Sequence, residues 1–230
     1  MKFLQEKLEF LLGKYSIDTK AELLDEKTVR IDGKDIPLLT HRSERRFFEL
    51  RNLVLGGTLE DVSVMRVSRI IEKGSDIYEA LYRELDICRY VLGRELVSIT
   101  VMRNDNVLNA ISTAADGVVC TLEISATLEA GEPAKDKHEV IARRGTCCDV
   151  VVDAQLRQDS VYFFGKENKK FTDMDFELYG LNVDQIAIVR AAFAIAQNKN
   201  YEEMLQNAAK VENLVALAKK SEQSGEREVV

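Results

Sequence analysis

The stretch DIYEALYRELDICRYVLGRELVSITVMRN, residues 76–104, contains the change of periodicity that decides the fold. Its first part predicts a helix over 76–92, because one face carries apolar residues at helical spacing, up to the stop at Gly93: Ile77, Leu81, Leu85, Cys88 and Leu92. After Gly93 apolar and polar residues alternate with a period of two, which is typical of strands. That pattern predicts strands over 96–103, 107–114, 118–127, 138–142, 148–153 and 160–164.

The flanking sequence adds helices on both sides of these strands. Before residue 76 we expect a helix over 3–12, a hairpin turning at Asp32-Gly33, a helix over 43–55 and a strand over 62–71. Residues 129–137 form a polar loop, and two helices follow that begin near Asn182 and Asn200, before a polar tail expected to fray from Ser221. This order predicts an α+β fold, a large, mostly antiparallel β-sheet with helices packed on one face. Residues 1–40 would be an N-terminal helix and hairpin extension, and 41–230 a single compact domain.

The composition and charge of the chain argue against several classes of function. The chain has 230 residues and a net charge of -7, which argues against a nucleic-acid binder. No apolar run reaches the roughly 20 residues that span a bilayer, and the start lacks the features of a signal peptide, so we expect a cytoplasmic protein with no membrane contact. The four cysteines show no CxxC spacing and we expect no metal site; Cys147-Cys148 are interpreted as reduced structural residues, with a redox role as the alternative.

Five blocks in order resemble the C-terminal domain of the Gfo/Idh/MocA family, the glucose–fructose oxidoreductase and inositol dehydrogenase relatives. They are HRSERRF (41–47) leading into LVLGGTLEDV (53–62), LDICRYVLG (85–93) followed by VSI (97–99), DGVVCTLEIS (116–125), HEVIARRGT (138–146), and the helix pair from Gln185 to Gly225. The resemblance covers about 190 residues. It implies the family's second-domain fold, without the N-terminal Rossmann domain that binds the dinucleotide.

Departures from the family pattern concern catalysis. The sequence contains neither the family's glycine-rich dinucleotide fingerprint nor its Glu-Lys-Pro motif, so we expect no cofactor. Where the family places an aspartate and a histidine four residues apart, this chain has Glu79 and Arg83. Arginine stays protonated and cannot relay a proton as histidine does. We therefore expect no catalytic residue, and no catalysis by this chain alone.

The remaining polar residues suggest a ligand pocket. Glu79, Arg83 and Asp86 share one helical face, and His41 and Arg42 fall where the resemblance implies substrate contact. Together they are the candidate pocket for a small polar or sugar-like ligand, with Arg83 as the anion-binding group. The alternatives are a salt-bridged helix surface and a plain loop. His138, in an alternating strand, is interpreted as a sheet residue rather than a ligand.

The sheet offers a candidate interface. Thr121, Glu123 and Ser125 alternate with apolar residues and form a mixed, mostly uncharged row that suits contact with another subunit. The function that follows is a free-standing, non-catalytic domain that forms a homodimer or higher oligomer, or binds a ligand or partner. The alternative is the substrate-binding subunit of a composite NAD(P)-dependent sugar or polyol dehydrogenase, whose Rossmann domain is on another chain. A third possibility is a chain shortened from a larger parent.

Overall fold

The computed structural model describes residues 1–149, 160–172, 177–178 and 180–230. The chain divides into two units, one of residues 1–44 and 174–210, the other of 45–173 and 211–230. The division differs from the expected boundary after residue 40, because 174–210 group with the N-terminal part. Within the first unit, α4 (Val183–Asn198) packs against α1 (Lys2–Lys14) and against the 3₁₀ helix η1 (Thr40–Ser43).

The first unit combines a small sheet with helices. Its sheet has the order β1-β2-β3, with bounds Ala21–Leu23, Thr28–Ile31 and Lys34–Pro37. The predicted hairpin is confirmed: β2 and β3 pair antiparallel, and Asp32 and Gly33 turn with φ of 50° and 81°. The spacing of Asn182 and Gln185 also gives a capping box, in which each side chain accepts from the other residue's backbone N–H.

The second unit is built on a nine-stranded sheet among the described residues, in the order β11-β10-β9-β8-β4-β7-β6-β5-β12. β4 and β7 run parallel and the other pairs are antiparallel, which confirms the predicted sheet type. The strands are β4 (Val62–Glu72), β5 (Leu96–Asn104), β6 (Val107–Ala114), β7 (Val119–Leu128), β8 (Lys135–Ala142), β9 (Gly145–Cys148), β10 (Ser160–Phe164), β11 (Lys169–Thr172) and β12 (Glu228–Val229).

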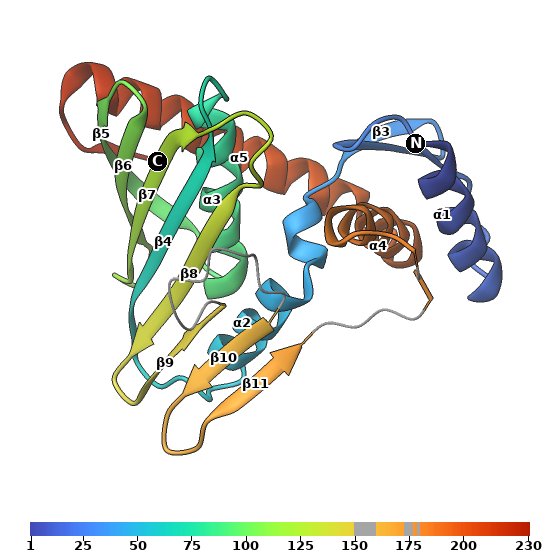
Figure 1. The fold of residues 1–230 in the computed structure, drawn as a ribbon, viewed down its shortest axis with the longest axis horizontal. Coiled ribbons are helices and arrows are strands. Elements are labelled where there is room, and N and C mark those ends of the chain that lie inside the picture. Colours follow the sequence, from blue (N-terminus) through green and yellow to red (C-terminus); the bar gives the residue numbers. More distant parts are fainter. Residues whose placement is uncertain (150–159, 173–176, 179) are drawn as a thin grey trace. The chain divides into compact units, whose positions relative to one another are not determined.

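Helices line one face of this sheet (Figure 1). They are α2 (Arg45–Leu55), α3 (Ile77–Leu92) and the part of α5 (Tyr201–Ser224) that belongs to this unit. The core contains Phe47 of α2, Leu81 and Leu85 of α3, and Val211 of α5, against inward strand residues such as Leu122. The other face of the central strands is open and carries the alternate residues. This is the predicted arrangement of helices on one face.

The structure changes two local expectations. Strand β8 begins at Lys135, inside the stretch expected to be a loop, so the Asp136 side chain belongs to the sheet. The tail does not fray as expected, because β12 pairs antiparallel with β5 and the Ser221 hydroxyl accepts from the Val101 amide at 3.0 Å. The end of the strand expected over 148–153 lies outside the described residues. In the described part of the chain, no helix is long and apolar enough to cross a membrane.

Candidate functional site

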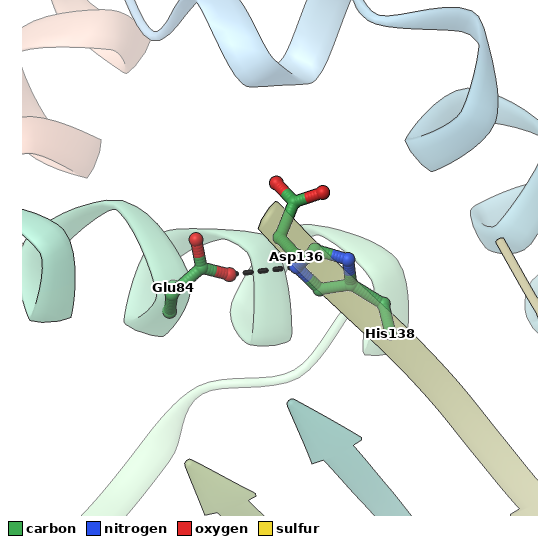
Figure 2. A group of neighbouring side chains, drawn as sticks. All are labelled: Glu84, Asp136 and His138. Atoms are coloured by element: carbon green, nitrogen blue, oxygen red, sulfur yellow. Dashed lines mark hydrogen bonds and ion pairs between the residues drawn. The ribbon is translucent and has the colours of Figure 1, made fainter. Parts of the chain in front are cut away.

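Seven charged or titratable side chains meet on the helix side of the large sheet, within the second unit. We call them the arginine–carboxylate cluster: Arg46 of α2, Arg69 of β4, Arg83 and Glu84 of α3, Asp136 and His138 of β8, and Asp149, which follows β9. Figure 2 shows Glu84 reaching from α3 toward the two residues of β8.

Strand alternation places the sheet members of the cluster. Arg69 and Asp136 are register partners in the β4–β8 pair, so their side chains leave the same face of the sheet. His138 lies two residues farther along β8, on the same face, and its neighbour two residues on, Val140, is fully buried. Glu84 is fully buried on α3, one residue before the core residue Leu85. Polar side chains thus occupy positions that would otherwise face an apolar core.

His138 is bound between two carboxylates. Its Nε2 lies 2.7 Å from Glu84 Oε2, and its Nδ1 lies 2.7 Å from Asp149 Oδ2. The other Asp149 oxygen accepts from the His138 backbone amide at 2.7 Å. The imidazole also meets the ring of Phe47 edge to face, with centroids 4.7 Å apart. Both ring nitrogens of His138 therefore have a hydrogen-bond partner within the protein.

The three guanidinium groups surround Asp136. Arg46 donates to it in a bidentate pair, at 2.6 Å from Nη1 and 2.9 Å from Nη2, and Nη1 also reaches Asp149 at 2.9 Å. Arg69 and Arg83 donate to Asp136 Oδ2 through their Nη1 atoms at 2.9 Å and 3.3 Å. Arg83 also donates to Glu84 Oε1 at 2.6 Å. The cluster is a connected network rather than a set of separate pairs.

These contacts shift the protonation equilibria. Burial alone would lower the pKa of His138, but Asp149 and Glu84 raise that pKa to about 9. Burial opposes ionisation of Glu84 and Asp136, yet the charges of Arg83 and His138 at Glu84, and of Arg46 and Arg83 at Asp136, hold both pKa values below their ordinary range. At neutral pH the histidine is thus protonated and both carboxylates are ionised.

The cluster does not fit a metal ion, although one triad has suitable spacing. Ligand atoms of Glu84, Asp136 and His138 lie within 4.8 Å of one another. However, both ring nitrogens of His138 face carboxylates, and the oxygens of Asp136 accept from guanidinium groups. A cation would have to displace these donors and lie among three arginines, which Coulomb repulsion opposes.

Of the residues predicted to form the pocket, Arg83 is the one that joins the cluster. Glu79 is exposed on α3. Asp86 is fully buried and pairs with Arg89 at 3.2 Å, and Arg89 in turn pairs with Glu95 at 2.8 Å. The structure therefore gives these three helix residues different surroundings.

His41 and Arg42 lie in η1, and thus in the first unit, and His41 is buried. Glu79, Arg83 and Asp86 belong to the second unit, and the predicted pocket stays a prediction. The interpretation of His138 as a sheet residue is correct but incomplete, because the sheet turns it toward Glu84.

The predicted interface row lies on the open face of the sheet. On β7 the odd-numbered residues Thr121, Glu123 and Ser125 are exposed or half-buried, while the residues between them are buried. Their register partners on β6 are Ile111, Asn109 and Val107. Ile111 and Val107 are exposed apolar residues, at 53% and 41%, so the face is more apolar than the β7 row alone suggests.

Comparisons with known proteins connect this architecture to a group of enzymes. No family model matches the sequence, and no curated protein matches it. Solved structures do match. Levoglucosan dehydrogenase in complex with NADH and levoglucosan has a TM-score of 0.67 at 11% identity, over 84% of this chain and 65% of that chain.

The fold resembles that of the C-terminal domain of Gfo/Idh/MocA-type oxidoreductases. An oxidoreductase domain protein from Kribbella flavida matches with a TM-score of 0.66 at 12% identity, over 84% of this chain and 64% of that chain. An oxidoreductase from Agrobacterium radiobacter, in complex with NAD+, L-tartaric acid and magnesium, matches with a TM-score of 0.65 at 14% identity and the same coverage. The chain spans less than two-thirds of the length of these proteins.

Proposed function

We propose that this chain is a non-catalytic relative of these oxidoreductases that self-associates through the open face of its large sheet. The observation that carries the proposal is the composition of that face. Along β5 and β6 it exposes Met102, Val107 and Ile111, at 74%, 41% and 53%. Apolar side chains of this size, grouped on neighbouring strands, mark a surface that gains free energy when another surface covers it.

A second copy of the chain suits this face because both charge signs alternate across it. Glu123 pairs in register with Ser68 of β4, and Ser68 with Lys137 of β8. One step along the strands, Arg66 and Glu139 form an ion pair at 3.4 Å. A two-fold axis through such a face would set acidic groups of one copy against basic groups of the other.

The absence of catalysis is inferred from Arg83. It stands where the resemblance expects the histidine that relays a proton, and arginine is always protonated near neutral pH. Its contacts to Glu84 and Asp136 also tie it into a structural network. We expect no saturable calorimetric heat with NAD or NADP up to about a millimolar, where binding corresponds to about -4 kcal/mol.

Light scattering of the purified chain tests the self-association. The unchanged protein should have the mass of a dimer or larger oligomer. Thr121→Lys, which faces Ile111, should reduce it to a monomer because like charges would meet near the axis. Thr58→Lys is the matched control, since Thr58 is exposed in the turn before β4. A monomeric unchanged protein would refute the proposal.

A composite dehydrogenase is the second candidate, favoured by the NADH and levoglucosan bound in one structural neighbour. In that arrangement another chain supplies the nucleotide-binding domain and this chain contacts the sugar. Identification of the proteins that co-purify at native expression separates the two candidates. A stoichiometric partner with a glycine-rich nucleotide loop supports the second, whereas the chain alone supports the first.

A further inference from the structure

Arg69 is incompletely paired within the arginine–carboxylate cluster. Its ion pairs to Asp136 and Glu84, at 2.9 Å and 3.3 Å, both run through Nη1. Its Nε is buried and, among the residues that the structure describes, has no hydrogen-bond partner. A buried donor left without an acceptor destabilises the folded protein, so an acceptor brought there by a ligand would recover that free energy.

The unpaired atom lies on the side of the guanidinium that binds planar anions. Nε and the neighbouring Nη2 present parallel N–H groups, which match the two oxygens of a carboxylate. Burial, followed by the charge of Arg83, lowers the pKa of Arg69, which means that the cation is destabilised where it stands. A bound anion would offset both the desolvation and the repulsion.

Exposure shows where a ligand could enter. The histidine end of the cluster is closed, since the side chains of Glu84, His138 and Asp149 are fully buried. By contrast, 16% of the side-chain surface of Arg69 and 19% of that of Arg83 remain exposed to solvent. A small molecule in solvent can therefore reach the exposed part of the two arginines without opening the buried end, and the Arg69 guanidinium must turn to bring its buried Nε to that molecule.

We propose that Arg69, with the charge of Arg83 beside it, binds the carboxylate group of a small monoanionic ligand. Glu84 and Asp136 favour a ligand with a single negative charge, because both carboxylates contact the Arg69 guanidinium. A doubly charged phosphate would meet stronger repulsion from them than a carboxylate does. The site lies on the helix side of the sheet, so it is independent of self-association through the open face.

Sodium acetate is the probe, compared with sodium chloride and sodium phosphate at equal ionic strength on the full chain. We expect a saturable shift of the Arg69 Nε–Hε NMR resonance, with a Kd on the order of a millimolar, the scale of one charge-assisted pair. Chloride should give no saturable shift, and phosphate a weaker one. The absence of saturation with acetate, an equal response to chloride, or tighter binding of phosphate would each overturn the proposal.

Two matched variants locate the site. Arg69→Lys keeps the charge but removes the paired donors, and should weaken acetate binding about ten-fold or more in calorimetry. Arg66→Lys is made on the same strand but on the open face, where Arg66 is exposed, and should leave acetate binding unchanged. An equal loss in both variants would overturn the site. If circular dichroism shows that Arg69→Lys is unfolded, the acetate titration of the Arg69 Nε–Hε resonance in the unchanged protein tests the site by itself.

Discussion

Glu84 Oε2 lies 2.7 Å from His138 Nε2, and both side chains are fully buried. Since Asp149 lies equally close to the other ring nitrogen, a neutral imidazole could donate to only one of its two carboxylate neighbours. The protonated ring satisfies both. One proton therefore helps to hold α3, β8 and the residue after β9 together.

Stability should consequently fall as the pH rises. The pKa of His138 is about 9 in the folded protein and 6.5 as the ordinary value, so its contribution is complete below pH 6.5 and is lost as the pH approaches 9. The pKa difference corresponds to roughly 3 kcal/mol. Urea unfolding at pH 6, 7.5 and 9 measures the loss.

At acid pH the dependence of stability on pH has the opposite sign. The lowered pKa values of Glu84 and Asp136 contribute stability above their ordinary values of 4.5 and 3.8, and that contribution is lost as the pH falls below them. Stability should be greatest between about pH 5 and 6.5. His138→Gln should flatten the alkaline side; a slope as steep as that of the unchanged protein would show that His138 is not the group responsible.

Removing Arg46 should destabilise the second unit strongly. Arg46→Met deletes the bidentate partner of Asp136 and a donor to Asp149, which leaves buried carboxylates poorly paired. Loss of one partner of a buried ion pair typically costs about 3–5 kcal/mol. The adjacent Arg45 is the control, because its side chain is exposed and its replacement by Met should cost under about 1 kcal/mol. Similar unfolding midpoints for the two variants would contradict the network.

Most of the fold could be predicted because it is encoded locally. The helix stripe from Ile77, the Asp32-Gly33 turn and the alternation of β7 each report on a few neighbouring residues. The pairing of β12 with β5 could not be predicted, since Glu228 meets Ile99 across 129 positions of the chain. Neither short segment signals its partner.

The cluster was missed for the same reason. Arg69 and Asp136 are neighbours only through strand register, and the sequence pattern predicts a loop at Asp136. A local signal does exist: Arg69 lies two residues from Val67 and two from Ile71, which are buried, so its side chain leaves the same inward face of β4 and requires a partner. The charged partner could not be named without the tertiary structure.

The C-terminal turn should depend on one hydroxyl. Ser221 is fully buried, accepts from the Val101 amide at 3.0 Å and donates to the Glu226 carbonyl at 2.6 Å. Ser221→Ala leaves that amide buried without its acceptor, so unfolding free energy should fall by about 1–3 kcal/mol. Ser224→Ala, at an exposed position, should change it by less than about 0.5 kcal/mol. Equal effects in denaturant titrations would argue against the role of Ser221.

Arg83 should behave as a network residue rather than as an exposed helix residue. Arg83→Ala removes the donor that lies 2.6 Å from Glu84, while Glu84 keeps His138 and Arg69 as partners. We therefore expect the free energy of unfolding to fall by about 1–3 kcal/mol. Glu79→Ala, on the exposed side of α3, should cost less than about 0.5 kcal/mol. A loss of stability in Arg83→Ala as small as that in Glu79→Ala would show that Arg83 belongs to a salt-bridged helix surface.

Restoring the histidine of the family pattern should not restore an enzyme. In Arg83→His the new imidazole would lie beside Glu84 and could exchange a proton. One proton-transfer group supplies neither a bound nicotinamide to accept hydride nor the lysine of the Glu-Lys-Pro motif that the family pattern contains. We expect no NAD- or NADP-dependent oxidation of levoglucosan or myo-inositol, followed by absorbance at 340 nm, from either the variant or the unchanged chain. Oxidation by Arg83→His alone would show that this chain binds the cofactor, and the non-catalytic proposal would then be wrong.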